Sequence, residues 1–232
     1  GRSRPHLLGE LYSQEATSML PVQALRAAHG AAPAGAPRVL DLCAAPGSKT
    51  TQLGAWLCGA GLLVANEPEP GRARRLRTNL LRCGVTGHLL TCLDGRLLGD
   101  LAADAFDAVV VDAPCSAEGN LRKRPEVLEH WSELARAEGG ESPLRALQWG
   151  LLCSAWRALR PGGLLVYATC TLNGLENEAL CSRLLDEAGS SAGCVDLPAL
   201  LGLPQAAAGA GFLRLWPHRF DAEGFFVACL HK

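Results

Sequence analysis

Two cysteines lie in two unlike short motifs, and each motif directly follows an apolar run that is typical of a buried β-strand. Cys115 lies in an Asp-Ala-Pro-Cys-Ser motif after the run 108–111, and Cys170 lies in a Thr-Cys-Thr motif after the run 164–167. Parallel strands of an open α/β sheet bind ligands at their carboxyl ends, so we expect both thiols at one ligand-binding edge. Two thiols at such an edge favour covalent chemistry, in which one thiolate attacks and the other thiol assists.

The elements that must position these thiols follow a β/α alternation. Strands are expected at 38–42, 62–66, 88–93, 106–111, 164–168, 211–216 and 224–230, and the main helices at 49–58, 71–83, 143–159 and 175–188. The alternation predicts an α/β fold with a mostly parallel sheet and helices on both faces. The last two expected strands are close together in the chain and predict an antiparallel closing pair.

A small-residue loop and three acidic residues follow the first four expected strands. The loop 43–49 allows a close approach of backbone to a ligand, and the helix after it offers free N–H groups. Glu67 is placed to bind ribose hydroxyls, Asp94 is placed to accept from an adenine amino group, and Asp112 ends the fourth strand. A single acid of this kind can simply cap a helix, but the ordered set predicts a cofactor that contains adenosine.

Two nucleotide-binding motifs are absent from the chain. Neither GxxxxGK(S/T) nor GxGxxG is present, so no phosphate-binding loop is recognisable. We therefore expect S-adenosylmethionine as the cofactor rather than a dinucleotide.

The composition limits the class of protein. The 232 residues suffice for one α/β domain with a sizeable core, and no apolar run reaches the ~18 residues that span a bilayer. Ten cysteines occur without a CxxC motif or zinc-finger spacing of Cys and His, so we expect reduced thiols, no metal site and an intracellular protein. We expect residues 1–30 to be an N-terminal extension packed on the core, and residues 31–232 to form the catalytic domain.

The net charge of −1 lacks the basic balance common in nucleic-acid binders, but the basic residues are clustered. Five arginines lie within the expected helix 71–83, where a solvated face is the simplest interpretation. Arg122, Lys123 and Arg124 follow Cys115 closely in an expected loop. This second cluster is therefore our candidate for contact with phosphate groups.

Taken together, several segments resemble the Sun-type RNA cytosine-C5 methyltransferases. These segments are 40–50, 112–116, 169–171 with 176–178, 223–227, the lead-in 12–21, and Asn66 with Glu67. The resemblance covers nearly the whole chain and implies a Rossmann-like class I S-adenosylmethionine-dependent methyltransferase fold. One departure is Ala117, which stands where the family usually has glycine.

The resemblance also implies roles for individual residues. The implied cofactor-binding residues are Cys43, Ala44, Ala45, Pro46, Gly47, Ser48, Lys49, Glu67, Asp94 and Asp112. Cys170 would be the nucleophile and Cys115 the helper. The implied substrate is RNA, with ribosomal RNA expected, and the target base must be unpaired or flipped out of its stack. A monomer is expected.

The chemistry explains why two thiols are needed. Carbon 5 of cytosine is a poor nucleophile, and a thiolate that adds to carbon 6 makes the ring reactive enough to accept a methyl group. The carbon-5 proton must then leave and the attacking thiol must be expelled. Cys115 is placed to assist this release step. Asp112 is also placed to hydrogen-bond the cytosine edge.

Two other functions stay open on the sequence alone. In a DNA cytosine-C5 methyltransferase, the thiol of the Pro-Cys motif, Cys115, would itself be the nucleophile. A non-catalytic ribosome-assembly factor that binds S-adenosylmethionine would need neither thiol.

Overall fold

The computed structural model describes residues 3–30, 35–127 and 142–232. The strands are β1 (Arg38–Asp41), β2 (Leu62–Asn66), β3 (His88–Thr91), β4 (Phe106–Asp112), β5 (Leu159–Thr169), β6 (Gly193–Cys194), β7 (Leu213–Leu215) and β8 (Phe225–His231). The α-helices are α1 (Arg4–Leu7), α2 (Leu20–His29), α3 (Ser48–Leu57), α4 (Pro70–Arg82), α5 (Leu98–Leu101), α7 (Pro143–Ala158), α8 (Glu178–Ala188) and α9 (Leu197–Leu200). Short 3-10 turns are η1 (Thr17–Met19), η2 (Gly95–Leu97), η3 (Glu118–Asn120), η5 (Gly189–Ser191) and η6 (Pro204–Ala206).

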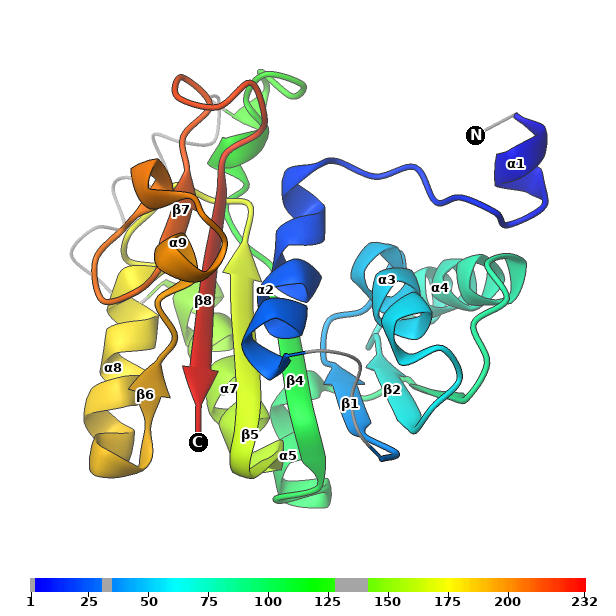
Figure 1. Ribbon diagram of the computed structural model, residues 1–232, viewed down its shortest axis with the longest axis horizontal. Helices are drawn as coiled ribbons and strands as arrows, with labels where there is room; N and C mark the ends of the chain where they lie inside the picture. The colour runs from blue at the N-terminus through cyan, green and yellow to red at the C-terminus, as the bar shows by residue number, and fades with distance from the viewer. Residues whose placement is uncertain (1–2, 31–34, 128–141) are drawn as a thin grey trace.

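The described strands form one sheet in the order β3-β2-β1-β4-β5-β8-β6, with β7 paired to β8 beside this path. Strands β1 to β5 run parallel to one another, while β8 runs antiparallel to β5, β6 and β7. The carboxyl ends of the five parallel strands therefore meet at one edge, which is the upper edge in Figure 1. The order reverses between β1 and β4, and such a switch point opens a crevice for ligands in sheets of this kind.

The alternation of side chains along the strands explains the helical layers. Ala108 and Val110 of β4 pack into the hydrophobic cluster formed with α2, α3 and α4. Val109 and Val111 point to the opposite face and pack with α5, α7 and α8. Because successive residues of a strand face opposite sides, one apolar run supplies both halves of the core. Helices thus cover both faces of the sheet (Figure 1).

These observations confirm the α/β fold, the mostly parallel sheet and the antiparallel pairing of the last two strands. The predicted start of the fifth strand at residue 164 was wrong, since β5 begins at Leu159. Leu159 pairs with Phe106 next to a register shift, and the Gly162 amide donates to the Lys232 carbonyl at 2.6 Å. Hydrogen bonds on both sides thus continue β5 through its Pro-Gly-Gly segment, although such a segment usually ends a helix and lies in a turn.

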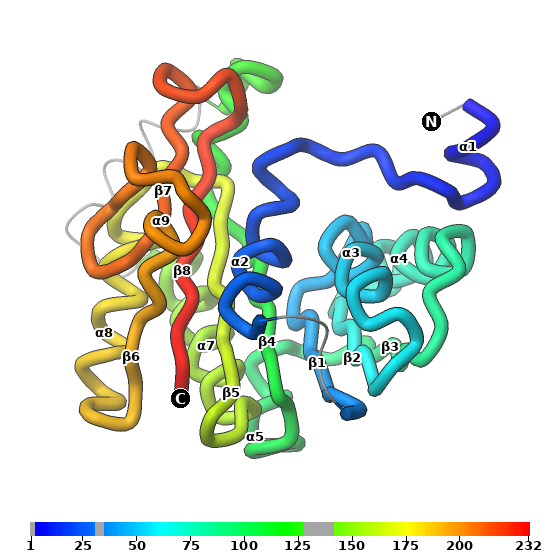
Figure 2. The backbone as a smooth tube through the Cα atoms, in the orientation of Figure 1, coloured from blue at the N-terminus to red at the C-terminus, as the bar shows by residue number. Residues whose placement is uncertain are grey.

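The N-terminal segment crosses from one side of the molecule to the other. Figure 2 shows an extended chain that leads from α1, near α4, to α2 on the sheet. The Arg82 side chain holds the start of this path, because it donates to the His6 carbonyl at 2.6 Å and lies 5.7 Å from the Tyr12 ring. Val22 and Leu25 of α2 are fully buried. The division of the chain at residues 30 and 31 stays a prediction, and residues 31–34 lie outside the described part.

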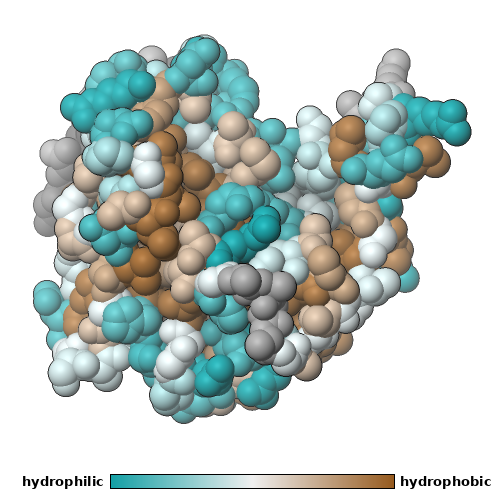
Figure 3. Space-filling view, viewed as in Figure 1, coloured by the Kyte–Doolittle hydropathy of each residue, from teal (hydrophilic) through white to brown (hydrophobic). Residues whose placement is uncertain are grey.

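Hydrophobic and hydrophilic residues are mixed on the surface that carries α2 (Figure 3). Hydrophobic residues gather beside α1 and near α9, where Leu7 and Leu200 are 64% and 43% exposed. Across the described ranges, we find no helix with both the length and the apolar character needed to cross a membrane.

Candidate functional site

Each strand of the series β3-β2-β1-β4-β5 carries a predicted site residue at or just after its carboxyl end. In that spatial order the site elements are Asp94, Glu67, the loop 43–47, Asp112 and Cys170. The sheet order therefore arranges in a row groups that are far apart in the sequence. Such a row at the carboxyl edge is the usual place for a ligand in an open α/β sheet.

The two cysteines meet at the end of this row. The Sγ atoms of Cys115 and Cys170 are 3.3 Å apart. The loops that carry them leave β4 and β5, which are neighbours in parallel register with Asp112 opposite Ala168. The expectation that both thiols lie at one edge of the sheet is thus met by direct contact between them.

The surroundings give the two thiols opposite acidities. The hydrogen bond from Cys115 lowers the pKa of Cys170, and burial opposes this effect. The Asn120 amide, 3.4 Å from the Cys170 sulfur, and the Lys49 ammonium lower the pKa of Cys170 further, while Asp112 raises it. The same hydrogen bond, followed by burial, raises the pKa of Cys115 well above its ordinary value. The favoured ionised form is therefore a Cys170 thiolate that accepts from a Cys115 thiol.

Lys49 lies on the inner side of the site and is paired with Asp112. Its Nζ is 2.7 Å from Asp112 Oδ2 and 5.4 Å from the centre of the Phe225 ring. The Lys49 side chain is 6% exposed, whereas the Asp112 side chain is 35% exposed. Asp112 can therefore still meet a ligand, while Lys49 supplies a buried positive charge to this part of the site.

The loop between β1 and α3 is held in shape at several points. Gly47 has a φ angle of +113°, and a Cβ atom there would lie 3.1 Å from the Leu76 side chain. The Ser48 hydroxyl is hydrogen-bonded to Gln14 and lies 3.0 Å from the Ser18 hydroxyl. The lead-in segment therefore fastens the start of α3. Glycine is needed in this loop because other residues adopt such a φ angle only with strain.

The same loop also holds a partly buried thiol and two small buried residues. Ala44 and Ala45 are buried, and the Ala44 amide donates to the Asn66 carbonyl at 2.9 Å. The Pro46 carbonyl accepts from the Asn79 side chain at 2.8 Å. Burial raises the pKa of Cys43 well above its ordinary value, so this cysteine is a neutral thiol.

Asp41, at the end of β1, is a buried carboxylate that the sequence patterns did not single out. It is fully buried, its Oδ2 accepts from the Thr50 hydroxyl at 2.7 Å, and its Oδ1 has no hydrogen-bond partner within the described chain. Burial raises its pKa to about 6. A carboxylate with an unused oxygen beneath the loop is free to accept from a ligand or a water molecule.

Glu67 and Asp94 are placed as expected at the strand ends, and both have partners. Glu67 is 1% exposed, and its carboxylate accepts from the Glu69 amide at 3.0 Å and lies 3.3 Å from Arg72. Asp94 is more open, and the Arg96 side chain donates to both of its oxygens. A ligand that reaches Glu67 must therefore displace Arg72 or share the carboxylate with it.

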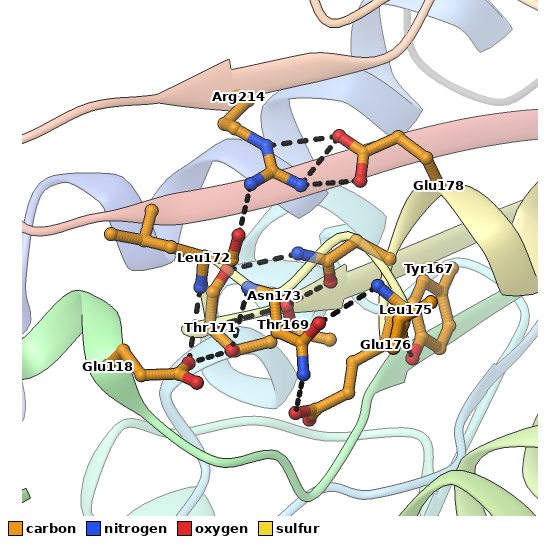
Figure 4. A network of polar contacts seen from close by, with 11 residues as sticks. Glu118, Tyr167, Thr169, Thr171, Leu172, Asn173, Leu175, Glu176, Glu178 and Arg214 are labelled. Carbon is orange, nitrogen blue, oxygen red and sulfur yellow. Dashed lines mark hydrogen bonds and ion pairs between the residues drawn. The ribbon is translucent and has the colours of Figure 1, made fainter. Parts of the chain in front are cut away.

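A network of buried polar contacts shapes the loop that carries Cys170 (Figure 4). The Arg214 guanidinium forms an ion pair with Glu178 and also donates to the Leu172 carbonyl. Thr171 donates to Glu118, which belongs to η3 beside the Cys115 loop. These contacts tie the segment after β5 to two other parts of the chain.

Sequence patterns did not single out several residues that the structure brings to the cysteines. Asn120 follows the Cys115 motif by four residues, and Gln148 lies in the middle of α7, where nothing in the periodicity marks it. The candidate phosphate-binding cluster is also less free than expected. Arg122 pairs with Asp221, Lys123 with Glu15 and Glu223, and Arg124 with Glu126.

Ala117 occupies the position where the resembling family has glycine. Its φ angle is +64°, in the left-handed region that glycine adopts most easily. The loop thus keeps the conformation that a glycine would favour, at a modest cost in backbone strain.

Within the described ranges, no group of three or more His, Cys, Asp or Glu side chains is arranged to hold a metal ion. A cavity of about 570 Å³ is lined by Gln23, Arg26, Ala27, Gly30, Gln52, Ala55, Trp56, Cys58 and Leu201. None of these lining residues is among the predicted site residues.

The chain is similar in sequence to a known family and to several of its members. Residues 30–231 match the family described as "16S rRNA methyltransferase RsmB/F". The "Ribosomal RNA small subunit methyltransferase F" of Aeromonas hydrophila is 46% identical to this chain over 233 residues, which cover all of this chain and 48% of the relative. The protein of the same name from Escherichia coli is 46% identical, and the match covers 47% of it. The chain thus spans about half the length of the curated relatives it matches.

Solved structures show the same fold. A methyltransferase homologue from Pyrococcus horikoshii has a TM-score of 0.77 and 29% identity, over 99% of this chain and 70% of that one. NSun6 from Pyrococcus horikoshii, solved with SFG, has a TM-score of 0.76 and 27% identity, over 100% of this chain and 55% of that one. SFG is an analogue of S-adenosylmethionine.

Proposed function

The chain belongs to the RsmB/F family of 16S rRNA methyltransferases, and from that premise we propose that it is the catalytic part of a ribosomal RNA cytosine-C5 methyltransferase that uses S-adenosylmethionine. The observation that carries this proposal is the 3.3 Å contact between Cys115 and Cys170 at the carboxyl edge of the sheet. The charges around the pair favour one thiolate and one thiol, which are the two forms that an attacking and an assisting group require.

S-adenosylmethionine, when bound, supplies the methyl group. The residues at the edge suit this cofactor, because Gly47 lets the loop take a conformation that other residues adopt only with strain, and because Asp41 has a buried oxygen without a hydrogen-bond partner in the described chain. The residues that would hold the cofactor are Cys43, Ala44, Ala45, Pro46, Gly47, Ser48, Lys49, Glu67, Asp94 and Asp112. Relatives support the choice, since the NSun6 structure contains SFG.

Cys170 is the proposed nucleophile. Its thiolate, held by the Cys115 thiol and the Asn120 amide, adds to carbon 6 of the cytosine and forms the bond S–C6. The ring electrons that this addition releases toward carbon 5 would then take the methyl group, and the bond from the methyl carbon to the donor's sulfur would break with its electrons left on that sulfur. Asp112, which is partly exposed and paired with Lys49, is placed to hydrogen-bond the cytosine edge or to contact the cofactor.

Cys115 is the proposed assisting group in the release step. Once the Cys170 sulfur is bonded to carbon 6, it carries no negative charge. The hydrogen bond to the Cys170 thiolate and the charge of that thiolate then no longer raise the pKa of Cys115, while burial still does. Cys115 then gives up its own proton to water, and the resulting thiolate accepts the carbon-5 proton, directly or through water, while the C5–C6 double bond re-forms and the S–C6 bond breaks. The Cys170 thiolate is thereby regenerated.

The reaction sets requirements on the target base and on the compartment of the cell. Carbon 6 of a stacked base is not accessible to a thiolate, so the target cytosine must be unpaired or flipped out. All ten cysteines are free thiols, which suits a reducing compartment inside the cell, and one chain holds both reacting thiols. We propose that the chain acts as a monomer.

The test separates the two cysteines. With 16S rRNA and labelled methyl donor, Cys170→Ala should form no covalent adduct and transfer no methyl group. Cys115→Ala should still add to the base but release product poorly. It should therefore accumulate as a protein–RNA complex that survives a denaturing gel.

Three other results would overturn the assignment. Trapping in Cys170→Ala alone would make Cys115 the nucleophile, as in the DNA-type enzymes, and a DNA substrate should then be methylated. Full turnover in both variants would mean that the covalent mechanism is wrong. Cofactor binding without turnover in the unaltered chain, with every RNA tested, would favour the ribosome-assembly factor.

A further inference from the structure

The residues on either side of Cys115 are held by two buried polar side chains that belong to other elements. The Gln148 amide, on α7, donates to the Pro114 carbonyl and to Glu176 Oε2, both at 2.8 Å. The Glu176 carboxylate accepts from the Ser116 amide at 3.1 Å and from the Ser116 hydroxyl at 2.5 Å. Cys115 thus lies between Pro114, which Gln148 holds, and Ser116, which Glu176 holds.

Both side chains are buried, so the loss of these hydrogen bonds would cost free energy. Gln148 is 0% exposed and Glu176 is 2% exposed. A buried polar group that loses its partner pays its full desolvation cost, so the two side chains strongly prefer the observed geometry. Gln148 is anchored by α7, whose Leu151 and Leu152 are buried against the sheet.

The residue types match the geometry. Both partners of Gln148 are acceptors, so an amide NH₂ with two donors satisfies them, whereas a glutamate would place two carboxylates side by side. Glu176 is surrounded by donors on both oxygens, since Asn173 Nδ2 donates to Oε1 at 3.1 Å in addition to Ser116. A carboxylate accepts at both oxygens, and a glutamine at this position would direct its NH₂ at a donor in either orientation.

Glu176 also connects the two cysteine loops. It lies in the segment that follows Cys170, and the Tyr167 hydroxyl of β5 donates to its carbonyl at 2.8 Å. Ser116 in turn lies 2.8 Å from the Thr171 hydroxyl. The distance between the two sulfurs therefore depends on how Glu176 and Gln148 hold the Cys115 loop.

We propose that Gln148 and Glu176 are positioning residues that hold Cys115 against Cys170, so that product release depends on them. The inference rests on the proposed function, and it assigns the task to two side chains that touch neither sulfur. If these side chains are altered, the Cys170 loop keeps its nucleophile while Cys115 is displaced from the site of proton removal.

The test uses Gln148→Leu, which removes both donors at similar volume, and Glu176→Gln, which places a donor against donors. Each variant should retain single-turnover methyl transfer and accumulate the covalent RNA complex, as Cys115→Ala does. Multiple turnover should fall by roughly 10- to 100-fold, the range expected when a reacting group is displaced by about an ångström. Alkylation of Cys170, followed by peptide mass spectrometry, should require a higher pH, because the thiol that donates to it has moved.

Tyr167→Phe is the matched control. It removes one buried hydrogen bond to Glu176 and leaves every bond to Pro114 and Ser116 in place. It should turn over and show no accumulation. Unchanged affinity for S-adenosylmethionine, measured by calorimetry, shows that each variant is folded, and if Gln148→Leu does not fold, Glu176→Gln decides alone.

The outcomes separate this inference from the proposed function. Accumulation in Cys115→Ala but in neither Gln148→Leu nor Glu176→Gln overturns the positioning role and leaves the function intact. Equal accumulation in Tyr167→Phe overturns it too, because any loosening would then suffice. If Cys115→Ala itself does not accumulate, the assisting role of Cys115 is wrong and the inference fails with it.

Discussion

At the scale of single residues, the site shows how position gives two identical side chains opposite properties. Cys115 and Cys170 are both partly buried thiols, yet the hydrogen bond between them lowers the pKa of one and raises that of the other. Cys115 and Asn120 both donate to the Cys170 sulfur. These two donors decide which of the two sulfurs carries the negative charge. Acidity here is therefore a property of the pair and its neighbours.

Asp41 gives a prediction about stability and pH. Burial raises its pKa from 3.8 to about 6, so the folded protein binds the proton more tightly than the unfolded chain does. This group therefore stabilises the fold most below its unfolded pKa, and that contribution is lost as the pH rises through 6. The loss amounts to about 3 kcal/mol in all, of which roughly 2 kcal/mol falls between about pH 4.5 and 7.5.

Asp41→Asn removes this titration. The free energy of unfolding of the variant, relative to the unaltered protein, should rise with pH over that interval when both are unfolded in urea without cofactor. Curves that stay parallel from about pH 4.5 to 7.5 would show that Asp41 titrates normally in the folded state.

At the scale of elements, the two loops that carry Cys115 and Cys170 are joined through a glycine that has no room for a side chain. The Gly119 amide in η3 donates to the Cys170 carbonyl at 2.9 Å, and its own carbonyl accepts from the Gly224 amide at 3.0 Å. A Cβ atom at Gly119 would lie 2.1 Å from the Gly224 oxygen and 2.7 Å from the Cys170 oxygen. The three segments can approach one another only because this residue has no side chain.

Gly119→Ala should therefore separate η3 from the ends of β5 and β8. We expect a loss of about 1–3 kcal/mol in the free energy of unfolding, because the clash is with backbone atoms that cannot rotate away. Activity on RNA should fall as well, since the sulfurs are drawn apart. Thermal unfolding and a methylation assay measure the two effects.

Gly174→Ala is the control for this change. A Cβ atom there meets only the Glu178 side chain, at 3.4 Å, and the residue lies in the same loop region. It should fold and methylate nearly as well as the unaltered chain. Equal damage from both substitutions would mean that the loops resist any added atom, whatever its contacts.

At the scale of the whole molecule, the distribution of charge bears on how the proposed RNA substrate would be held. Arg122, Lys123 and Arg124 all form ion pairs. By contrast, α4 carries three exposed arginines that make no ion pair with any residue in the described ranges. They are Arg74, Arg75 and Arg77. The helix arginines are therefore freer to meet phosphate groups than the loop cluster that the sequence favoured.

We expect this chain to bind single-stranded RNA weakly, with a shallow dependence on salt. Three unpaired arginines would give a slope of about −2 in a plot of log affinity against log salt concentration, since each contact contributes about 0.7. Replacing Arg74, Arg75 and Arg77 together with glutamate should weaken binding more than Arg122→Glu does. A larger loss from Arg122→Glu, measured by fluorescence anisotropy, would restore the loop as the phosphate contact.

Much of this architecture could be read from local patterns, because those patterns reflect short-range physics. Apolar runs predict strands at β1 to β4 within about two residues, since strand residues that pack against the core are apolar. The two cysteine motifs and the acids at the strand ends were recognisable for the same reason, as each lies a fixed few residues after its strand. The two-residue strand β6 has too little sequence to form a pattern, and its pairing with β8 comes from long-range contacts.

Other properties depend on groups that only folding brings together. Gln148 is an ordinary polar residue of a helix until α7 packs beneath the Cys115 loop, 34 residues away in sequence from its partner Pro114. The ion pairs of Arg122 and Lys123 join positions about 100 residues apart. Amino-acid sequence alone determined which residues could react and at which edge of the sheet they lie. Tertiary structure decided which sulfur carries the charge and which side chains hold it there, because acidity and position depend on neighbours that are distant in the chain.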